Sequence, residues 1–216
     1  MEIEAKFTVP DASVFQRLIQ VERLAGHALT PARLKQLHDR YLDTADGGFL
    51  RGGYACRVRD DGGGRPLLTL KSLTPAQGAL HARQELEARL PAQAGLDVAS
   101  WPDCPAASLA VELSRGQPLA VLFDLRQARY QRLATLVEGQ EALVELSIDH
   151  TRFGAAADSG LLGVEVELLP GGDRASLQAI ADELQWTWGL DPQPTSKFEW
   201  GLLLAHPELV PLLDAR

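Results

Sequence analysis

The first seven residues, Met1-Glu2-Ile3-Glu4-Ala5-Lys6-Phe7, constrain the fold of this chain more than any other stretch. Side chains alternate between the two faces of a β-strand. In a strand, Glu2, Glu4 and Lys6 therefore share one face, and the opposite face is apolar. A single strand of this kind is typical of any sheet with one solvated face. The pattern becomes informative because it recurs along the chain.

Charged residues alternate with apolar residues in several further stretches that read as strands. We expect strands over residues 37–44, 54–60, 66–72, 81–90, 119–136, 142–149 and 161–169. The run Asp61-Gly62-Gly63-Gly64 predicts a hairpin between the second and third of these. A second helical piece or a loop is expected near Thr30-Pro31. The sequence thus predicts about eight strands.

Helices are expected at the edges of this sheet. Pro10-Asp11 opens a short helix that runs to about Gln20, and a helical insertion is expected near 91–118, with its helix at about 106–114. Two C-terminal helices are expected within 173–206, the second starting at Ser196 with capping-box spacing. With 216 residues, of which 45% are hydrophobic, the chain suits a single domain spanning 1–216.

Composition excludes several classes of protein. A net charge of −8 argues against a duplex nucleic-acid binder, although a concentrated basic cleft can still bind a small polyanion. The two cysteines form no disulfide framework and no zinc motif. No apolar run is long enough to cross a bilayer, and the acidic N-terminus is no signal peptide. We therefore expect a cytoplasmic protein without a membrane partner.

Two arrangements of the charged faces are open from the residues alone. In an ordinary antiparallel sheet they would face water. In a closed barrel of about eight strands they would face a lumen just wide enough for side chains or one small ligand. Rows of carboxylates inside a barrel would require cations, and oxygen-only ligands favour Mg²⁺ or Mn²⁺. The basic residues would then require a polyanion, and a chain of phosphates meets both requirements.

The ordered set of charged motifs resembles the CYTH superfamily, the triphosphate tunnel metalloenzymes. Glu2-Ile3-Glu4-Ala5-Lys6 is similar to the N-terminal Glu-x-Glu-x-Lys signature of that family. The resemblance continues, in the expected order, through Arg57-Val58-Arg59, Leu68-Thr69-Leu70-Lys71, Arg83-x-Glu85-x-Glu87, Arg129, Glu145 to Asp149, Glu165-Val166-Glu167 and Ser196-Lys197-Phe198. It implies an α+β fold in which a closed eight-stranded antiparallel barrel forms a tunnel, with helices packed outside.

The resemblance also implies roles for individual residues. Metal ligands for Mg²⁺ or Mn²⁺ would be Glu2, Glu4, Asp149, Glu165 and Glu167. The phosphates would be held by Lys6, Arg57, Arg59, Lys71, Arg83, Arg129 and Lys197, and Glu4, Lys6 and Arg59 are expected to be catalytic. Glu85, Glu87 and Glu145 would either support the metal ligands from behind or serve as structural partners of basic residues.

The function implied is that of a metal-dependent triphosphatase acting on inorganic triphosphate or a related compound. The ending Ser-Lys-Phe-Glu-x-Gly-Leu looks most like the CYTH domain of bacterial inorganic triphosphatases, which often carry a C-terminal helical CHAD domain. The alternatives are an adenylate cyclase or a thiamine triphosphatase of the same fold, or a non-catalytic polyphosphate- or nucleotide-binding module. The expected partner is a small triphosphate, and the expected state is a monomer or a homodimer.

Overall fold

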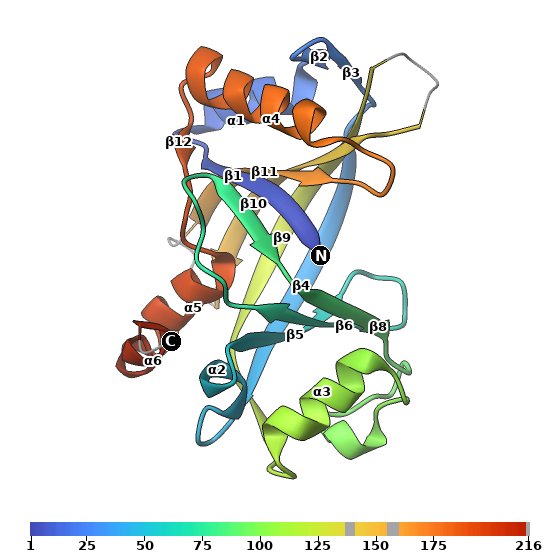
Figure 1. The fold of residues 1–216 in the computed structure, drawn as a ribbon, viewed down its shortest axis with the longest axis vertical. Helices are drawn as coiled ribbons and strands as arrows, with labels where there is room; N and C mark the ends of the chain where they lie inside the picture. The colour runs from blue at the N-terminus through green and yellow to red at the C-terminus, as the bar shows by residue number, and fades with distance from the viewer. Residues whose placement is uncertain (137–140, 155–159, 215–216) are drawn as a thin grey trace.

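The computed structural model describes residues 1–136, 141–154 and 160–214, and one antiparallel sheet dominates it (Figure 1). The long strands follow one another in the spatial order β1, β11, β10, β9, β4, β5 and β6. Their bounds are β1 (Glu2–Thr8), β4 (Arg33–Thr44), β5 (Tyr54–Asp60), β6 (Leu67–Ser72), β9 (Leu119–Thr135), β10 (Val144–Phe153) and β11 (Gly160–Leu168). Strands β4 and β9 run the length of the molecule and pair along the whole of β4.

The sheet nearly closes on itself through residues 80–89. The sequence predicts one strand over 81–90, but the chain forms two, β7 (Leu80–Arg83) and β8 (Glu85–Arg89). Strand β7 pairs with β1, whereas β8 pairs with β6, so this segment joins the two edges of the sheet. At the break, the N–H of Ser72 on β6 donates to the carbonyl of Gln84 at 2.9 Å. The strand must divide because it serves two partners that diverge.

The predicted class, an antiparallel barrel with helices outside, is confirmed. The expected number of strands is slightly low, because the hydrogen-bonded path through the described residues contains nine, including the short β12 (Asp191–Pro192). No helix is found near Thr30-Pro31; a loop there leads directly into β4, which begins earlier than the predicted residue 37. A small hairpin of β2 (Arg23–Leu24) and β3 (His27–Leu29) precedes that loop.

Helices cover the apolar outer face of the barrel, which leaves the charged face to the interior. Helices α1 (Ala12–Gln20) and α4 (Arg174–Asp182) pack on β1, β10 and β11, burying Phe7 and Leu146 (Figure 1). Helix α3 (Pro105–Ser114) and the 3₁₀ turn η1 (Val98–Ser100) cover β6 and β8, where Leu68 and Leu70 are buried. The apolar side of these strands is therefore shielded from bulk water.

The helix starts follow from capping residues. Asp11 accepts the N–H of Val14 at 2.9 Å at the start of α1, as the sequence predicts. Ser196 and Glu199 form the predicted capping box of α5 (Lys197–Ala205), which packs on β9. The remaining elements are α2 (Gly48–Arg51), the π-helical turn η2 (Glu183–Thr187), η3 (Pro207–Leu209) and α6 (Pro211–Asp214). In the described ranges, no helix has the length and apolarity needed to span a membrane.

Candidate active site

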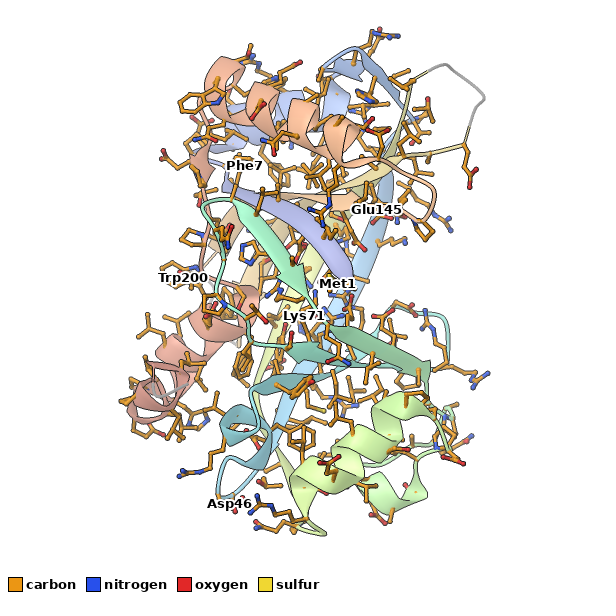
Figure 2. All side chains as sticks on the ribbon, in the orientation of Figure 1. Met1, Phe7, Asp46, Lys71, Glu145 and Trp200 are labelled. Carbon is orange, nitrogen blue, oxygen red and sulfur yellow. The ribbon has the colours of Figure 1, made fainter. Side chains whose placement is uncertain are left out.

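The inner faces of the strands enclose one cavity of about 160 Å³, called the lumen below. The first residues of α5 also contribute to its wall. Its charged lining residues are Glu2, Glu4, Lys6, Arg57, Arg59, Lys71, Arg83, Glu85, Glu87, Arg129, Glu165, Glu167 and Lys197. Figure 2 shows Lys71 near the centre of the molecule, where side chains of several strands converge. The charged rows therefore face inward rather than toward bulk water.

Glu4 occupies the centre of one wall and is almost fully buried. Its Oε1 accepts a hydrogen bond from Arg83 of β7 and lies 3.1 Å from Nζ of Lys6. The same ammonium lies 3.1 Å from Oε1 of Glu165 on the neighbouring strand β11. Burial raises the pKa of Glu4, but Lys6 and Lys71 lower it further, to about 2. Glu4 is therefore a carboxylate throughout the physiological range.

Lys71 on β6 lies beside Glu2, the first residue of β1. Its Nζ lies 2.7 Å from Oε2 of Glu2 and 3.5 Å from Oε1 of Glu85. The pKa of Glu2 is nevertheless raised, chiefly by burial, because Lys71 compensates only part of the lost hydration. On this wall the ammonium group of Lys71 on β6 lies between the carboxylates of Glu2 on β1 and Glu85 on β8.

Next to this wall, a compact cluster of charges comes from β9, β10, β11 and α5. Arg129 donates Nε and Nη2 to the two carboxylate oxygens of Asp149 at 2.9 and 2.7 Å, and its Nη2 also donates to Glu165 at 2.9 Å. Nζ of Lys197 lies 2.8 Å from Asp149 and 2.7 Å from Glu165. Burial raises the pKa of Glu165, but Lys197 and Lys6 hold it well below its usual range. Two cations and two anions thus neutralise one another here.

A third group of charges comes from β5. Arg57 donates Nη2 to Oγ1 of Thr69 at 3.0 Å, and Arg59 binds both oxygens of Asp39 on β4. Both guanidinium groups line the lumen, whereas Asp39 lies behind them, fully buried. Arginine suits this position because its planar fork engages two oxygens at once.

Glu167 lines the lumen, and burial raises its pKa more than its basic neighbour Lys71 lowers it. Glu167 lies opposite Glu4 in the β1–β11 register. Burial and the nearby carboxylates Glu2 and Glu4 raise the pKa of Glu167 to about 8. Burial and its two neighbours therefore disfavour the charged form of Glu167.

The family model of the CYTH domain matches residues 1–200. The chain belongs to the CYTH family. A search of curated proteins finds no match.

Solved structures share this CYTH fold. A protein from Hippeastrum, described as a candidate adenylyl cyclase with a dominant triphosphatase activity, is 21% identical, with a TM-score of 0.68 over 93% of this chain and 95% of its own. A candidate adenylate cyclase from Bacillus halodurans is 22% identical, with a TM-score of 0.62 over 91% of this chain and 94% of its own. At these identities the likeness establishes the fold alone.

The CYTH lumen brings together most of the residues that the sequence singles out. All seven predicted phosphate-binding residues line it, and so do Glu2, Glu4, Glu165, Glu167, Glu85 and Glu87. Asp149 lies directly behind the lining, bound to Arg129 and Lys197. Glu145 does not line the lumen, and Figure 2 shows this residue away from the centre of the molecule. Its Oε2 accepts a hydrogen bond from Gln131 at 2.6 Å.

Basic side chains already bind four of the five predicted metal ligands, Glu2, Glu4, Asp149 and Glu165. Among the described residues, no three His, Cys, Asp or Glu side chains are already arranged to hold an ion. Asp149 and Glu165 are bound by Arg129 and Lys197. The group formed by Glu2, Glu4 and Glu167 has the oxygen-only chemistry of a hard cation, and burial together with Glu2 and Glu4 raises the pKa of Glu167. Mg²⁺ or Mn²⁺ would be held by these carboxylates.

The sequence interpretation missed Asp39, for which the sequence carries only part of the signal. Residues 37–44 are predicted to form a strand, and Asp39 and Tyr41 share one face of that strand because they are two residues apart. In the structure Tyr41 lines the CYTH lumen beside Phe198, and the two ring centroids lie 5.4 Å apart. The alternation indicates only that Asp39 shares a face with Tyr41; that Asp39 meets Arg59 depends on the register between β4 and β5.

Proposed function

We propose that this CYTH protein is a divalent-metal-dependent triphosphatase that hydrolyses inorganic triphosphate to diphosphate and orthophosphate. The observation that carries the proposal is the enclosed lumen, in which basic side chains for a phosphate chain and carboxylates for a cation face one another. The description of the Hippeastrum protein, which shares the fold and is said to have a dominant triphosphatase activity, agrees with this proposal.

The charge balance of the lumen supports a requirement for metal. Seven basic and six acidic side chains line the cavity, and Asp39 and Asp149 lie directly behind them. A triphosphate brings several negative charges into a space where the protein charges already nearly cancel. Burying uncompensated charge is costly, so the substrate would need accompanying cations. A cation at Glu2, Glu4 and Glu167 would also release the basic side chains that these carboxylates now hold.

The basic residues would position the substrate for attack by water. Arg57, Arg59, Arg129 and Lys197 all line the lumen and would hold the phosphate chain extended. Water would attack the terminal phosphorus, the P–O bond to the bridging oxygen would break, and diphosphate would leave. When bound, a divalent ion supplies Lewis-acid polarisation to such a reaction. Catalysis would then rest on positioning and electrostatic stabilisation, without a covalent intermediate.

A substrate panel tests the proposal. Orthophosphate release is measured with inorganic triphosphate, thiamine triphosphate and ATP, each with Mg²⁺, with Mn²⁺ and with EDTA. We expect metal-dependent release that is fastest with inorganic triphosphate. Release with EDTA equal to that with metal would contradict the metal requirement.

The same panel distinguishes the alternatives. Cyclic AMP and diphosphate formed from ATP would identify a cyclase, and preference for thiamine triphosphate would identify a thiamine triphosphatase. Tight binding of triphosphates without any phosphate release would identify a binding module.

A further inference from the structure

Asp39 is a buried carboxylate that the proposed reaction does not yet use. Its side chain is fully buried on β4, and it does not line the lumen. Arg59 donates Nε to Oδ1 at 2.6 Å and Nη2 to Oδ2 at 2.8 Å. Gln127 of β9 donates to Oδ2 at 3.0 Å, and Nη1 of Arg57 lies 3.6 Å from the same oxygen. Asp39 therefore acts on any ligand only through the side chains that hold it.

The contacts of Asp39 fix how the two arginines face the lumen. Arg57 and Arg59 lie two residues apart on one face of β5, so their positive charges repel each other. The carboxylate between their guanidinium groups offsets that repulsion. It occupies one edge of Arg59, and Nη1 on the other edge has no hydrogen-bond partner among the described residues. Arg59 lines the lumen, so this unoccupied edge is available to a ligand there.

We propose that Asp39 is a positioning residue for the triphosphate, which holds Arg59 and Arg57 in the orientation that binds the phosphate chain. The inference rests on the proposed function. Holding the arginines before the substrate arrives removes the cost of ordering two long side chains during binding. Loss of Asp39 should therefore weaken substrate binding more than it weakens the chemical step.

Asp43 provides a matched control on the same strand. It is also buried, being 2% exposed, but its carboxylate accepts the backbone N–H groups of Phe49 and Leu50 at 2.9 and 3.0 Å. Asp43→Asn and Asp39→Asn therefore remove the same charge at a similar depth. Only Asp39→Asn removes a partner of an arginine that lines the lumen.

The experiment measures KM and kcat for inorganic triphosphate with saturating Mg²⁺, together with the rise in Tm that the triphosphate produces. For Asp39→Asn we expect KM to rise about tenfold, the size of one lost charge-assisted hydrogen bond, with a smaller change in kcat and a reduced rise in Tm. Asp43→Asn should lower the Tm of the free protein and leave KM within about twofold of wild type.

A double variant tests whether Asp39 acts through Arg59. If it does, Asp39→Asn combined with Arg59→Gln should raise KM little beyond Arg59→Gln alone, because the two changes remove one interaction. The double variant also leaves no unpaired Arg59 charge, so its comparison with Arg59→Gln remains possible if Asp39→Asn alone does not fold.

Three results would overturn the inference. The first is an unchanged KM in Asp39→Asn, and the second is an equal rise in Asp43→Asn. The third is full additivity in the double variant. These results differ from failure of the proposed function, in which the wild-type protein itself neither binds nor hydrolyses inorganic triphosphate.

Discussion

Nζ of Lys197 lies 2.7 Å from Oε1 of Glu165, which joins the first residue of helix α5 to strand β11 inside the lumen. A cation in the first turn of a helix opposes the helix dipole, at a cost of about 0.3–1 kcal/mol. The ion pairs of Lys197 with Glu165 and Asp149 offset this cost. The position of Lys197 therefore balances the charge of the lumen and does not stabilise helix α5.

Lys197→Met should weaken binding of inorganic triphosphate without unfolding the barrel. Losing one charged contact to phosphate predicts a rise in KM of about tenfold or more. Steady-state kinetics measure the KM, and far-ultraviolet circular dichroism checks that the barrel is folded. Arg51→Met, an exposed cation outside the lumen, serves as the control. A wild-type KM in Lys197→Met would exclude Lys197 from the phosphate site.

Glu4→Gln should reduce metal-dependent turnover by at least about a hundredfold, because the change removes a proposed metal ligand and neutralises the partner of Lys6 and Arg83. The amide has the shape of the carboxylate, so the barrel should remain folded. Phosphate release and a melting curve are compared with those of Glu22→Gln, an exposed carboxylate outside the lumen. Undiminished activity would refute the assignment of Glu4.

Gly201→Ala should displace α5 from the barrel. A Cβ at this position would lie 2.0 Å from Cε2 of Phe123, whose ring stacks on Tyr41 with centroids 4.9 Å apart. Forcing a methyl group into such packing costs about 1–3 kcal/mol. The free energy of unfolding should fall by that amount, and triphosphate affinity should fall with it because α5 carries Lys197. Gly95→Ala, where nothing lies within 4 Å, should change neither.

Stability should depend on pH through His81. Nε2 of this buried imidazole lies 3.1 Å from the carbonyl oxygen of Gln193. Burial, reinforced by Lys6 and Arg83, lowers the pKa of His81 from 6.5 to about 4. Between these values the unfolded chain binds a proton that the folded chain does not, so stability is present above pH 6.5 and is lost as the pH falls below it.

The measurement is urea unfolding at pH 7.5 and pH 5.0. The wild-type protein should lose up to about 2 kcal/mol more than His81→Gln over this interval. The contribution of Glu4 is lost only below about pH 4.5. Glu167, whose raised pKa of about 8 gives the opposite dependence over this interval, is present in both proteins, so the difference between them reports His81. His206→Gln, which removes an imidazole outside the lumen that contacts Glu208 and the carbonyl of Leu122, serves as the control. An identical pH profile in His81→Gln would contradict the explanation.

The strands and their charged faces were predictable because alternation is a local property of the chain. Residues 54–60 form β5 as expected, and Arg57 and Arg59 face the lumen. The same local rule did not predict the break at Gln84, since the chain divides there to pair with two strands that are distant in sequence. It also gave no means of knowing that Asp39 would meet Arg59, which depends on the register between β4 and β5.

Strand β1 pairs with β11 and β7, so the barrel can finish folding only after both of those strands have been synthesised. During synthesis, residues 2–8 are made long before their main partner strand, which begins at residue 160. Contacts so distant in sequence close slowly. Until then the apolar side of the first strand, with Ile3, Ala5 and Phe7, lacks its neighbour in the nascent chain. The N-terminal segment is therefore the part for which chaperone protection during synthesis matters most.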